Sequence, residues 1–499
     1  MKDFFKKIFN VIFVIIIIYM IYSMYMYKLK TSYNRTMLYV VSILYIMIMI
    51  LCFRKISKKH IKKYMFIILG IIIVTIQIIC AYLFKVYPSW DFGIVYREAT
   101  DFFGKVDSID YFCKYPNNIP ILIFLKIIFY TFKLLNIKQY INVGITVNIL
   151  AIDLSILMVV LVVKEILGKE KAFFTLFFIT LMPIIYLSVP IFYTDTLSMP
   201  FTIMILYLYL KLKKQQNTRN KIIYSILIGI ITVLGMNIKV TVGIIYIAIL
   251  IYEIILNKKN NFRLYTLLSL GIIIMLIILE TLVFKYLFKY SDKLYNESFP
   301  VTHHIMMALD NNGTYTLKDE EFTTSFKTRK EKKKANIEEI NIRLKKYDTL
   351  NKKIKFITSK EIMIWNDGTY DIPQLLNNGH INNGKIQNSI YKNNDIYVYI
   401  SQMQRVSMMI LLVVSSLYKD DKKEENNDAV NVISRLSILG LILFFSFWEI
   451  RSRYIINYIP IFVVTQIIGI ELLDKKLKKR IKTKKEIHII DIVKRRGEM

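Results

Sequence analysis

Apolar runs of about 20 residues recur along the chain, and they constrain its fold more than any other feature. The first is "IFNVIFVIIIIYMIYSMYMY", and "YMFIILGIIIVTIQIICAYLF" is another. A helix needs about 20 apolar residues to cross the hydrocarbon core of a bilayer. One soluble core cannot account for so many separate runs. The sequence therefore predicts an all-α polytopic membrane protein with about 12–13 hydrophobic helices.

The first run is longer than the apolar core of a signal peptide and has no small-residue cleavage site, so we interpret it as a retained anchor. The apolar segments are predicted at 8–27, 37–53, 64–86, 119–136, 140–163, 172–189, 196–212, 222–237, 240–256, 264–288, 398–417, 431–448 and 453–472.

The formal net charge of +31 is distributed mainly in short loops between these segments. Examples are "RKISKKHIKK", "KLKKQQNTRNK" and the tail "DKKLKKRIKTKK". Basic residues in short loops are typical of the cytoplasmic side of a membrane protein, and they also favour anionic lipid headgroups. This position argues against nucleic-acid binding. The three cysteines, two of them inside apolar runs, do not suggest a disulfide framework.

Counting segments back from the basic tail places nearly every basic loop inside the cell. The same count places "FYTD", the turn at Lys239, the stretch 289–397 and "EIRSR" outside. Counting from the N-terminus places the "WDFG" loop outside, and the two counts conflict at 119–163. Either segment 119–136, with Lys126 and Lys133, lies in the membrane interface, or the charge rule fails at one loop.

Several ionisable residues share the predicted outer face. They are Asp91, Arg97, Glu98, Asp195, Lys239, Glu449, Arg451 and Arg453. Carboxylates can act as general bases or hold a divalent metal, whereas Lys and Arg match phosphate oxygens. A lipid-linked sugar phosphate presents its phosphate at the membrane surface. This set therefore suits glycosyl transfer from a lipid phosphate.

A plain alternative exists for each residue. Carboxylates at segment ends are often only solvated, and Trp90 would suit an interfacial aromatic belt. Lys239 fits that alternative less well, because an outer turn is an unusual place for a basic residue. Asp153 and Glu280 lie within apolar segments, where they either serve function or bond a neighbouring helix.

Five motifs in order resemble the GT-C superfamily of polytopic glycosyltransferases, specifically the bacterial relatives of protein O-mannosyltransferases and aminoarabinose transferases. They are "WDFG", "KYPNNIPILIFL" with Tyr115, "FYTDTLSMPF", "GIITVLGMNIKVTVG" and "EIRSRYIINYIP". The fourth departs from the family pattern, because Val-Thr follows Lys239 where the family has Gly-Pro. The resemblance covers most of residues 64–472.

The resemblance implies a GT-C fold, a polyprenyl-phosphate sugar donor and an acceptor outside the cytoplasm, with inversion by direct displacement. It implies that Asp91 is the general base or another key acidic group, with Glu98 as a further catalytic candidate, and that Asp195 orients the acceptor or helps bind a metal. Lys239 and Arg453 would meet the donor phosphate, with Arg97, Tyr115 and Arg451 as further binding residues. No cofactor is certain; a divalent metal at Asp91 and Asp195 is one option.

The predicted domains are N-terminal helices at 1–63 and a catalytic membrane core at 64–288 with outer loop 87–118. A mixed extracytoplasmic domain at 289–397, C-terminal helices at 398–473 and a basic cytoplasmic tail at 474–499 follow. The outer stretch contains the Lys-rich, Ile-spaced segment "KTRKEKKKANIEEINIRLKKYDTLNKKIKFI", which predicts amphipathic helix. This helix is either solvated or in contact with anionic lipid or polymer. The adjacent His303 and His304 do not have zinc-site spacing.

The predicted protein is thus a multi-pass plasma-membrane glycosyltransferase acting on a cell-envelope glycan, lipid or protein, with no nucleic-acid partner. Three rival classes remain open. A transporter of lipid-linked saccharides would place ionisable groups along a path through the bilayer, and Asp153 and Glu280 favour it. An envelope polymerase would share the lipid-phosphate substrate. A structural membrane protein with a partner-binding outer domain is a further alternative.

Overall fold

The apolar runs form long helices. The computed structural model describes residues 2–27, 34–102, 108–257, 262–287, 292–392, 395–417 and 425–497. Among these residues, ten helices are long and apolar enough to cross a bilayer, and they confirm an all-α polytopic membrane protein. They are α1 (Lys2–Met26), α2 (Arg35–Ile56), α3 (Lys63–Leu83), α6 (Ile119–Leu134), α7 (Tyr140–Leu167), α12 (Thr218–Ile238), α14 (Arg263–Leu287), α22 (Asp395–Ser415), α23 (Glu425–Phe447) and α24 (Ile459–Gly497).

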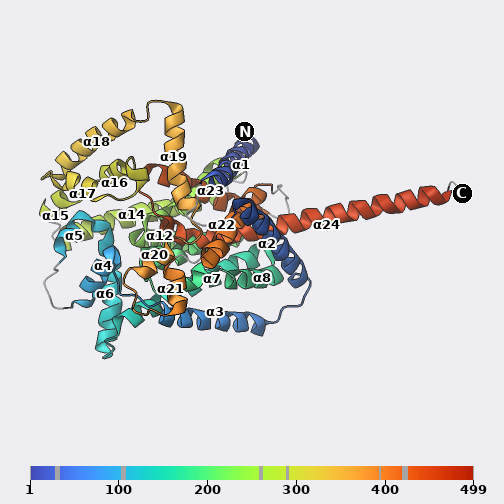
Figure 1. Ribbon diagram of the computed structural model, residues 1–499, viewed down its shortest axis with the longest axis horizontal. Helices are drawn as coiled ribbons and strands as arrows, with labels where there is room; N and C mark the ends of the chain where they lie inside the picture. Colours follow the sequence, from blue (N-terminus) through green and yellow to red (C-terminus); the bar gives the residue numbers. More distant parts are fainter. Residues whose placement is uncertain are drawn as a thin grey trace.

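The bundle is built around α24. The apolar part of α24 is buried over its whole length, and it packs against α22, α2 and α7. By contrast, α3 lies at the periphery, and few of its apolar side chains are buried. Figure 1 shows α24 projecting from one end of the molecule, while α15 (Asp292–Glu297) and α17 (Leu317–Thr324) lie at the opposite end. Figure 1 also shows α6 running across the direction of α3, although α6 and the preceding 3₁₀ turn η1 (Pro116–Asn118) together are long enough to cross the membrane.

The segments predicted at 172–189 and 196–212 differ from the expected pair of spanning helices. In their place are α8 (Lys169–Thr180), α9 (Ile184–Leu187), α10 (Thr194–Leu197) and α11 (Met199–Lys214). The reason is proline: Pro183 and Pro190 interrupt the chain, and Pro200 sits in the first turn of α11. Proline lacks a backbone N–H, so it is tolerated in the first turn of a helix but interrupts a helix further along. Asp195, one of the predicted site residues, lies in the break between α9 and α11.

The basic loops predicted to lie inside meet one another at one end of the bundle. Lys171 pairs with Glu471 at 2.6 Å, and Arg54 pairs with Asp474 at 2.7 Å. Lys6, at the start of α1, pairs with Asp428 at the start of α23 at 2.6 Å. Loops that are far apart in sequence therefore share one face, as the charge pattern predicts.

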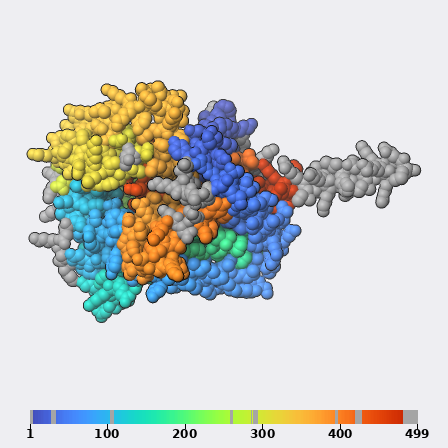
Figure 2. Space-filling model, in the orientation of Figure 1, coloured from blue at the N-terminus to red at the C-terminus, as the bar shows by residue number. Residues whose placement is uncertain are grey.

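The stretch 289–397 is helical rather than mixed in its described residues. It contains α16 (Val301–Met307), α18 (Arg329–Lys345), α19 (Leu350–Trp365), α20 (Ile372–Asn377) and α21 (Lys385–Tyr391). Its described β pairing is a single isolated bridge between Val86 and His380. Figure 2 shows α18 and α19, in yellow and light orange, along one edge of the surface beside α1.

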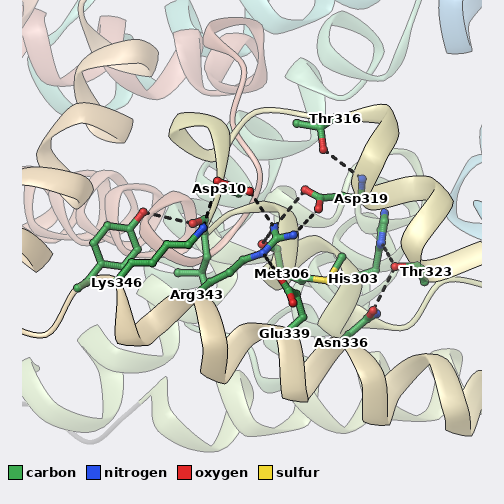
Figure 3. A network of polar contacts seen from close by, with 12 residues as sticks. His303, Met306, Asp310, Thr316, Asp319, Thr323, Asn336, Glu339, Arg343 and Lys346 are labelled. Carbon is green, nitrogen blue, oxygen red and sulfur yellow. Dashed lines mark hydrogen bonds and ion pairs between the residues drawn. The ribbon is translucent and has the colours of Figure 1, made fainter.

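A buried arginine holds three of these helices together. Arg343 of α18 donates hydrogen bonds to Asp319 of α17, to Glu339, and to the Met306 carbonyl of α16 at 2.8 Å (Figure 3). A buried charge is tolerated only when it is paired and hydrogen-bonded. His303 extends this network through Thr323 at 2.7 Å. Burial lowers the pKa of His303 to about 4, so this ring is neutral at physiological pH.

Candidate active site

Asp195 joins three segments that are far apart in the sequence. It lies in α10, in the break between α9 and α11, and its side chain is buried. One carboxylate oxygen contacts Lys239, the residue between α12 and the short helix η2 (Val240–Val242). The other accepts a hydrogen bond from Arg453 at 2.7 Å. Arg453 lies in the 3₁₀ helix η6 (Ser452–Tyr458), directly before the apolar part of α24.

The two cations decide the charge of Asp195. Burial alone would raise its pKa, but Lys239 and Arg453 hold the pKa of Asp195 below its ordinary value. The carboxylate is therefore ionised and its oxygens are both engaged. Asp195 is suited to positioning the two cations rather than to accepting a proton.

Trp90 links this ion cluster to Asp91. The guanidinium of Arg453 lies 4.4 Å from the centre of the Trp90 ring, and Trp90 also packs edge-on against Tyr193. Trp90 begins α4 (Trp90–Thr100) with a φ of 47°, which is uncommon for a residue with a large side chain. Such a conformation costs about 1–3 kcal/mol and is found mainly at functional sites. Here it places the next residue, Asp91, beside the cluster.

The Asp91 side chain borders open cavities, and the rest of the residue is surrounded by protein. Burial raises the pKa of Asp91, and the negative charges of Glu449 and Glu320 raise it further. Arg453 and a hydrogen bond from Tyr111 act in the opposite direction without cancelling the rise. Tyr111 is itself fixed by Asn118, whose amide donates to its hydroxyl at 2.6 Å. A carboxylate with a raised pKa that is open to a cavity has the properties of a general base.

Two cavities meet at Asp91. The first, about 400 Å³, lies toward α5 (Ile109–Lys114), η2 and the end of α23. The second, about 520 Å³, lies toward α4 and α20. Both are lined by Asp91, Tyr115, Glu449, Arg453 and Tyr454. These five residues therefore form the shared wall of the two cavities.

The two cavities differ in charge. The first has four cations on its lining, Lys114, Lys239, Arg329 and Arg453, against two carboxylates, Asp91 and Glu449. The second reverses the ratio: its cations are Arg451 and Arg453, and its carboxylates are Asp91, Glu320, Asp371 and Glu449. The first cavity also has an apolar side made by Phe299, Val301, Phe444, Phe445 and Trp448. It therefore suits an anionic group attached to an apolar one, while the second suits a neutral or hydroxyl-rich group.

Most of the predicted site residues come together. Asp91, Tyr115, Lys239 and Arg453 line the first cavity, Arg451 lines the second, and Asp195 supports both cations from behind. Tyr115 additionally donates to Glu320 at 3.3 Å.

Arg97 and Glu98 lie apart from this group, because they sit at the far end of α4 and line neither cavity. Glu98 is buried and accepts a hydrogen bond from the backbone N–H of Ser108 at 2.8 Å, which suits a role in fixing the loop. Asp153 and Glu280 also line neither cavity.

The residues present do not suit a metal shared by Asp91 and Asp195. Both oxygens of Asp195 are engaged by cations, so only Asp91 could donate to a metal there. Within the described part of the chain, no three His, Cys, Asp or Glu side chains are grouped as metal ligands. We therefore derive the chemistry from the side chains alone.

Some residues of the site have no signal in the sequence. His304 stacks on Trp448 with ring centres 4.7 Å apart, and its Nδ1 lies 3.6 Å from Glu449. Tyr454 donates to the other oxygen of Glu449 at 2.8 Å. Tyr111 of α5 and Glu320 and Asp371 of the outer stretch also line the second cavity. Of these, only Tyr454 had a nearby signal, because it directly follows Arg453.

Comparison with known proteins gives one family and one distant structure. Residues 1–472 match a family described as "Conserved hypothetical integral membrane protein". No curated protein sequence matches this chain. Among solved structures, the chain is similar to the archaeal oligosaccharyltransferase AglB from Archaeoglobus fulgidus, determined in complex with an inhibitory peptide and a dolichol-phosphate. The TM-score is 0.42 with 11% identity, and the match covers 85% of this chain but only 51% of that chain.

Proposed function

This chain belongs to that family of conserved integral membrane proteins, and from its site we propose that it is a membrane glycosyltransferase. The reaction moves a sugar from a polyprenyl-phosphate donor to an acceptor hydroxyl outside the cytoplasm. The observation that carries the proposal is the position of Asp91 on the wall between a basic and an acidic cavity.

The donor occupies the first cavity. Its phosphate lies against Lys239 and Arg453, which Asp195 holds in place, and Lys114 and Arg329 add positive charge. Lys and Arg are the side chains that bind phosphate oxygens most effectively. Phe444, Phe445 and Trp448, at and just beyond the end of α23, accept the first part of the polyprenyl chain.

The acceptor occupies the second cavity. Its hydroxyl meets Asp91, while Glu320 and Asp371 with Gln374 and Asn378 provide hydrogen-bonding partners for further polar groups. Arg451 lies on the same lining. This excess of carboxylates disfavours a strongly anionic acceptor, because like charges would meet in a partly desolvated space.

The chemical step is one displacement at the anomeric carbon. The acceptor oxygen forms a bond to this carbon from one side as its proton passes to Asp91. The bond between the carbon and the phosphate oxygen breaks on the other side, and the electron pair leaves with the polyprenyl phosphate. Arg453 and Lys239 stabilise the charge on that phosphate as it leaves. The sugar configuration is inverted, and no covalent enzyme intermediate forms.

The proposal assigns roles to the parts of the chain as well. Residues 1–63 and 398–473 support the catalytic core at 64–288, and residues 289–397 form an extracytoplasmic domain that closes both cavities. The site lies on the extracytoplasmic face, and the tail at 474–499 is cytoplasmic.

The test uses the purified chain in lipid bilayers with radiolabelled polyprenyl-phosphate hexoses and an envelope fraction as acceptor. We expect release of polyprenyl phosphate by the wild type. Asp91→Asn should lower the rate about 10²–10⁴-fold, the usual contribution of a general base. Asp110→Asn is the matched control, since Asp110 is an exposed carboxylate on the same outer loop that lines neither cavity.

The outcomes separate the rival functions. A folded Asp91→Asn variant with wild-type transfer overturns the assignment of the base. Label that crosses the bilayer without release of polyprenyl phosphate overturns the transferase and favours a transporter.

A further inference from the structure

Helix α19 lies at the ends of two membrane-spanning helices. The pair between Lys6 and Asp428 shows that α1 and α23 begin at the same end of the bundle, so both helices finish at the opposite end. Near that end, Thr358 of α19 hydrogen-bonds Tyr19 of α1 at 2.9 Å. Tyr19 is seven residues before Met26, the last residue of α1, which corresponds to about 10 Å along the helix. Lys360 donates to the carbonyls of Ser446 and Trp448, where α23 ends.

The direction of α19 is that of an interfacial helix. Figure 1 shows α19 running across the direction of α3 and α24, with its Leu350 end away from the bundle. A helix at the end of the spanning helices that runs across them lies along the plane of the bilayer surface. The first half of α19 then extends beyond the protein over the surrounding lipid.

An apolar stripe follows one face of α19, with one carboxyl group, Glu361, in its buried half. It contains Leu350, Ile354, Ile357 and Ile364, which share one face at helical spacing. Ile364 is fully buried against the bundle, whereas Leu350 is 72% exposed and Ile354 is 45% exposed. The exposed half of the stripe therefore continues a face whose other half is already packed.

Lysines cover the opposite face of the exposed half of α19, with Lys353 at the edge of the stripe. Lys352, Lys353 and Lys355 are all exposed. Two of them, with Lys346 and Ser359, line an open hollow of about 300 Å³ over the Tyr347 and Phe356 rings. Lys352 pairs with Asp348 at 2.9 Å in an exposed pair that a phosphate oxygen can replace. Ammonium groups around an apolar stripe match the phosphates and acyl chains of an anionic lipid.

We propose that the first half of α19 binds anionic phospholipid at the extracytoplasmic surface of the membrane. Leu350, Ile354 and Ile357 enter the boundary between headgroups and acyl chains, and Lys352, Lys353 and Lys355 contact lipid phosphates. Helix α18, although also rich in lysine, is solvated. Its exposed Ile337 and Ile342 belong to a helix that packs on α16 and α17 instead of the spanning bundle. This assignment does not rest on the proposed enzymatic activity.

The first arm of the test measures depth in the bilayer. The full chain, with its three cysteines replaced by alanine, carries a spin label at Ile354→Cys or Ile357→Cys, or at Ile342→Cys as the matched control. The protein is placed in bilayers of phosphatidylcholine and phosphatidylglycerol. Labels on α19 should collide with oxygen more than with a water-soluble nickel chelate, and the label on α18 should show the reverse. Nickel-accessible labels on α19 overturn the proposal.

The second arm measures how the stability of the protein depends on the charge of the lipid. Phosphatidylglycerol should raise the melting temperature of the wild type over its value in phosphatidylcholine alone. Replacing Lys352, Lys353 and Lys355 by Gln should weaken the apparent lipid affinity roughly fivefold for each lysine. Replacing Lys330, Lys333 and Lys334 of α18 removes the same charge and should leave the shift unchanged. An equal rise in melting temperature with inorganic phosphate in phosphatidylcholine points to a free-phosphate site. A change of oligomeric state in Ile354→Ser points to a second copy of the chain packed on this face. Either result overturns the proposal.

Discussion

At the residue scale, the two aspartates of the site have opposite environments and therefore opposite roles. Asp195 is enclosed by two cations that lower its pKa, whereas burial and nearby carboxylates raise the pKa of Asp91. Two carboxyl groups whose pKa values are moved apart can divide the work of a site between them. In the proposed reaction, Asp195 fixes the cations that bind phosphate, and Asp91 exchanges the proton.

The first prediction concerns the stability that Asp195 provides. Asp195→Asn leaves Lys239 and Arg453 close together without this counter-charge, and their side chains are only 12% and 11% exposed. Removing one partner of a buried ion pair costs about 3–5 kcal/mol. We therefore expect a large fall in the melting temperature of the purified protein. Adding Lys239→Met to this variant should recover part of the loss, because one of the two unpaired cations is removed. An Asp195→Asn protein that melts like the wild type would show that this cluster is not a structural anchor.

The second prediction concerns the pH dependence of transfer. A general base works only when it is deprotonated, so the rate should fall tenfold for each pH unit below the pKa of Asp91. Because that pKa is raised, the acid limb should lie above the ordinary aspartate value of 3.8. Glu320→Gln removes a negative charge that raises this pKa, and it should therefore move the limb to lower pH. The pH profile of kcat/KM measures the effect, with Asp110→Asn as control. A limb that stays in place in Glu320→Gln contradicts the coupling between the two carboxyl groups.

The residues that sequence reasoning found differ physically from those that it missed. Asp91, Lys239 and Arg453 follow or precede an apolar run, so the run itself fixes their level at the membrane surface. Arg97 and Glu98 met the same criterion and yet lie outside the site, because α4 carries them nearly two turns, about 10 Å, past Asp91. Glu320 and His304 come from the outer stretch, where no membrane boundary fixes the position of a side chain.

At the element scale, α19 is the part that joins the outer helices to the end of α23. Lys360 donates to two carbonyls at the end of α23, and Glu361 accepts hydrogen bonds from Ser446 and Trp365. Trp448 and Glu449 follow directly and face the first cavity. The anchoring of α19 therefore determines where this wall of the cavity lies.

The third prediction tests that anchor through pH. Burial raises the pKa of Glu361 to about 8, from an ordinary value of 4.5, although Ser446 and Trp365 oppose the rise. The folded protein then binds a proton that the unfolded chain has released between these two values. Stability from this group is therefore complete below pH 4.5 and is lost as the pH rises toward about 8.

In Glu361→Gln this contribution should disappear. The melting temperature should therefore decline less between pH 5 and pH 8 than in the wild type. The free energy of unfolding involved is roughly 1.4 kcal/mol for each unit by which the pKa is raised. Glu338→Gln, an exposed position on α18, should keep the wild-type decline. Parallel profiles for the wild type and Glu361→Gln would mean that Glu361 is ionised in the folded protein.

The elements were predictable where one long apolar run makes one helix, as in α3, α7 and α14. They were not predictable between 172 and 212, where Pro183 and Pro190 interrupt an equally apolar sequence. Hydropathy measures only whether a segment can enter lipid or a packed core, and does not show where the chain turns within it. The break is functional in the proposed mechanism, because it places the buried Asp195 beside Lys239 and Arg453.

At the scale of the whole molecule, charge divides the bundle into two ends. At one end, ion pairs such as Lys171 with Glu471 join basic loops to α24. At the other lie the two cavities and the outer helices. Positive loops are retained in the cytoplasm during insertion, so the first end should be cytoplasmic and the cavities should open outside. The proposed acceptor outside the cytoplasm depends on this orientation.

The fourth prediction tests the orientation directly. Single cysteines are introduced into the cysteine-free chain at Gln216, in the basic loop between α11 and α12, and at Asn341 of α18; both positions are exposed. A membrane-impermeant maleimide added to intact cells should label Asn341→Cys and leave Gln216→Cys unlabelled until the membrane is opened. Labelling of Gln216→Cys in intact cells, with Asn341→Cys protected, would show that the orientation in the membrane is the opposite of the predicted one. The cavities would then face the cytoplasm, and the donor would have to be a lipid-linked sugar of the inner leaflet.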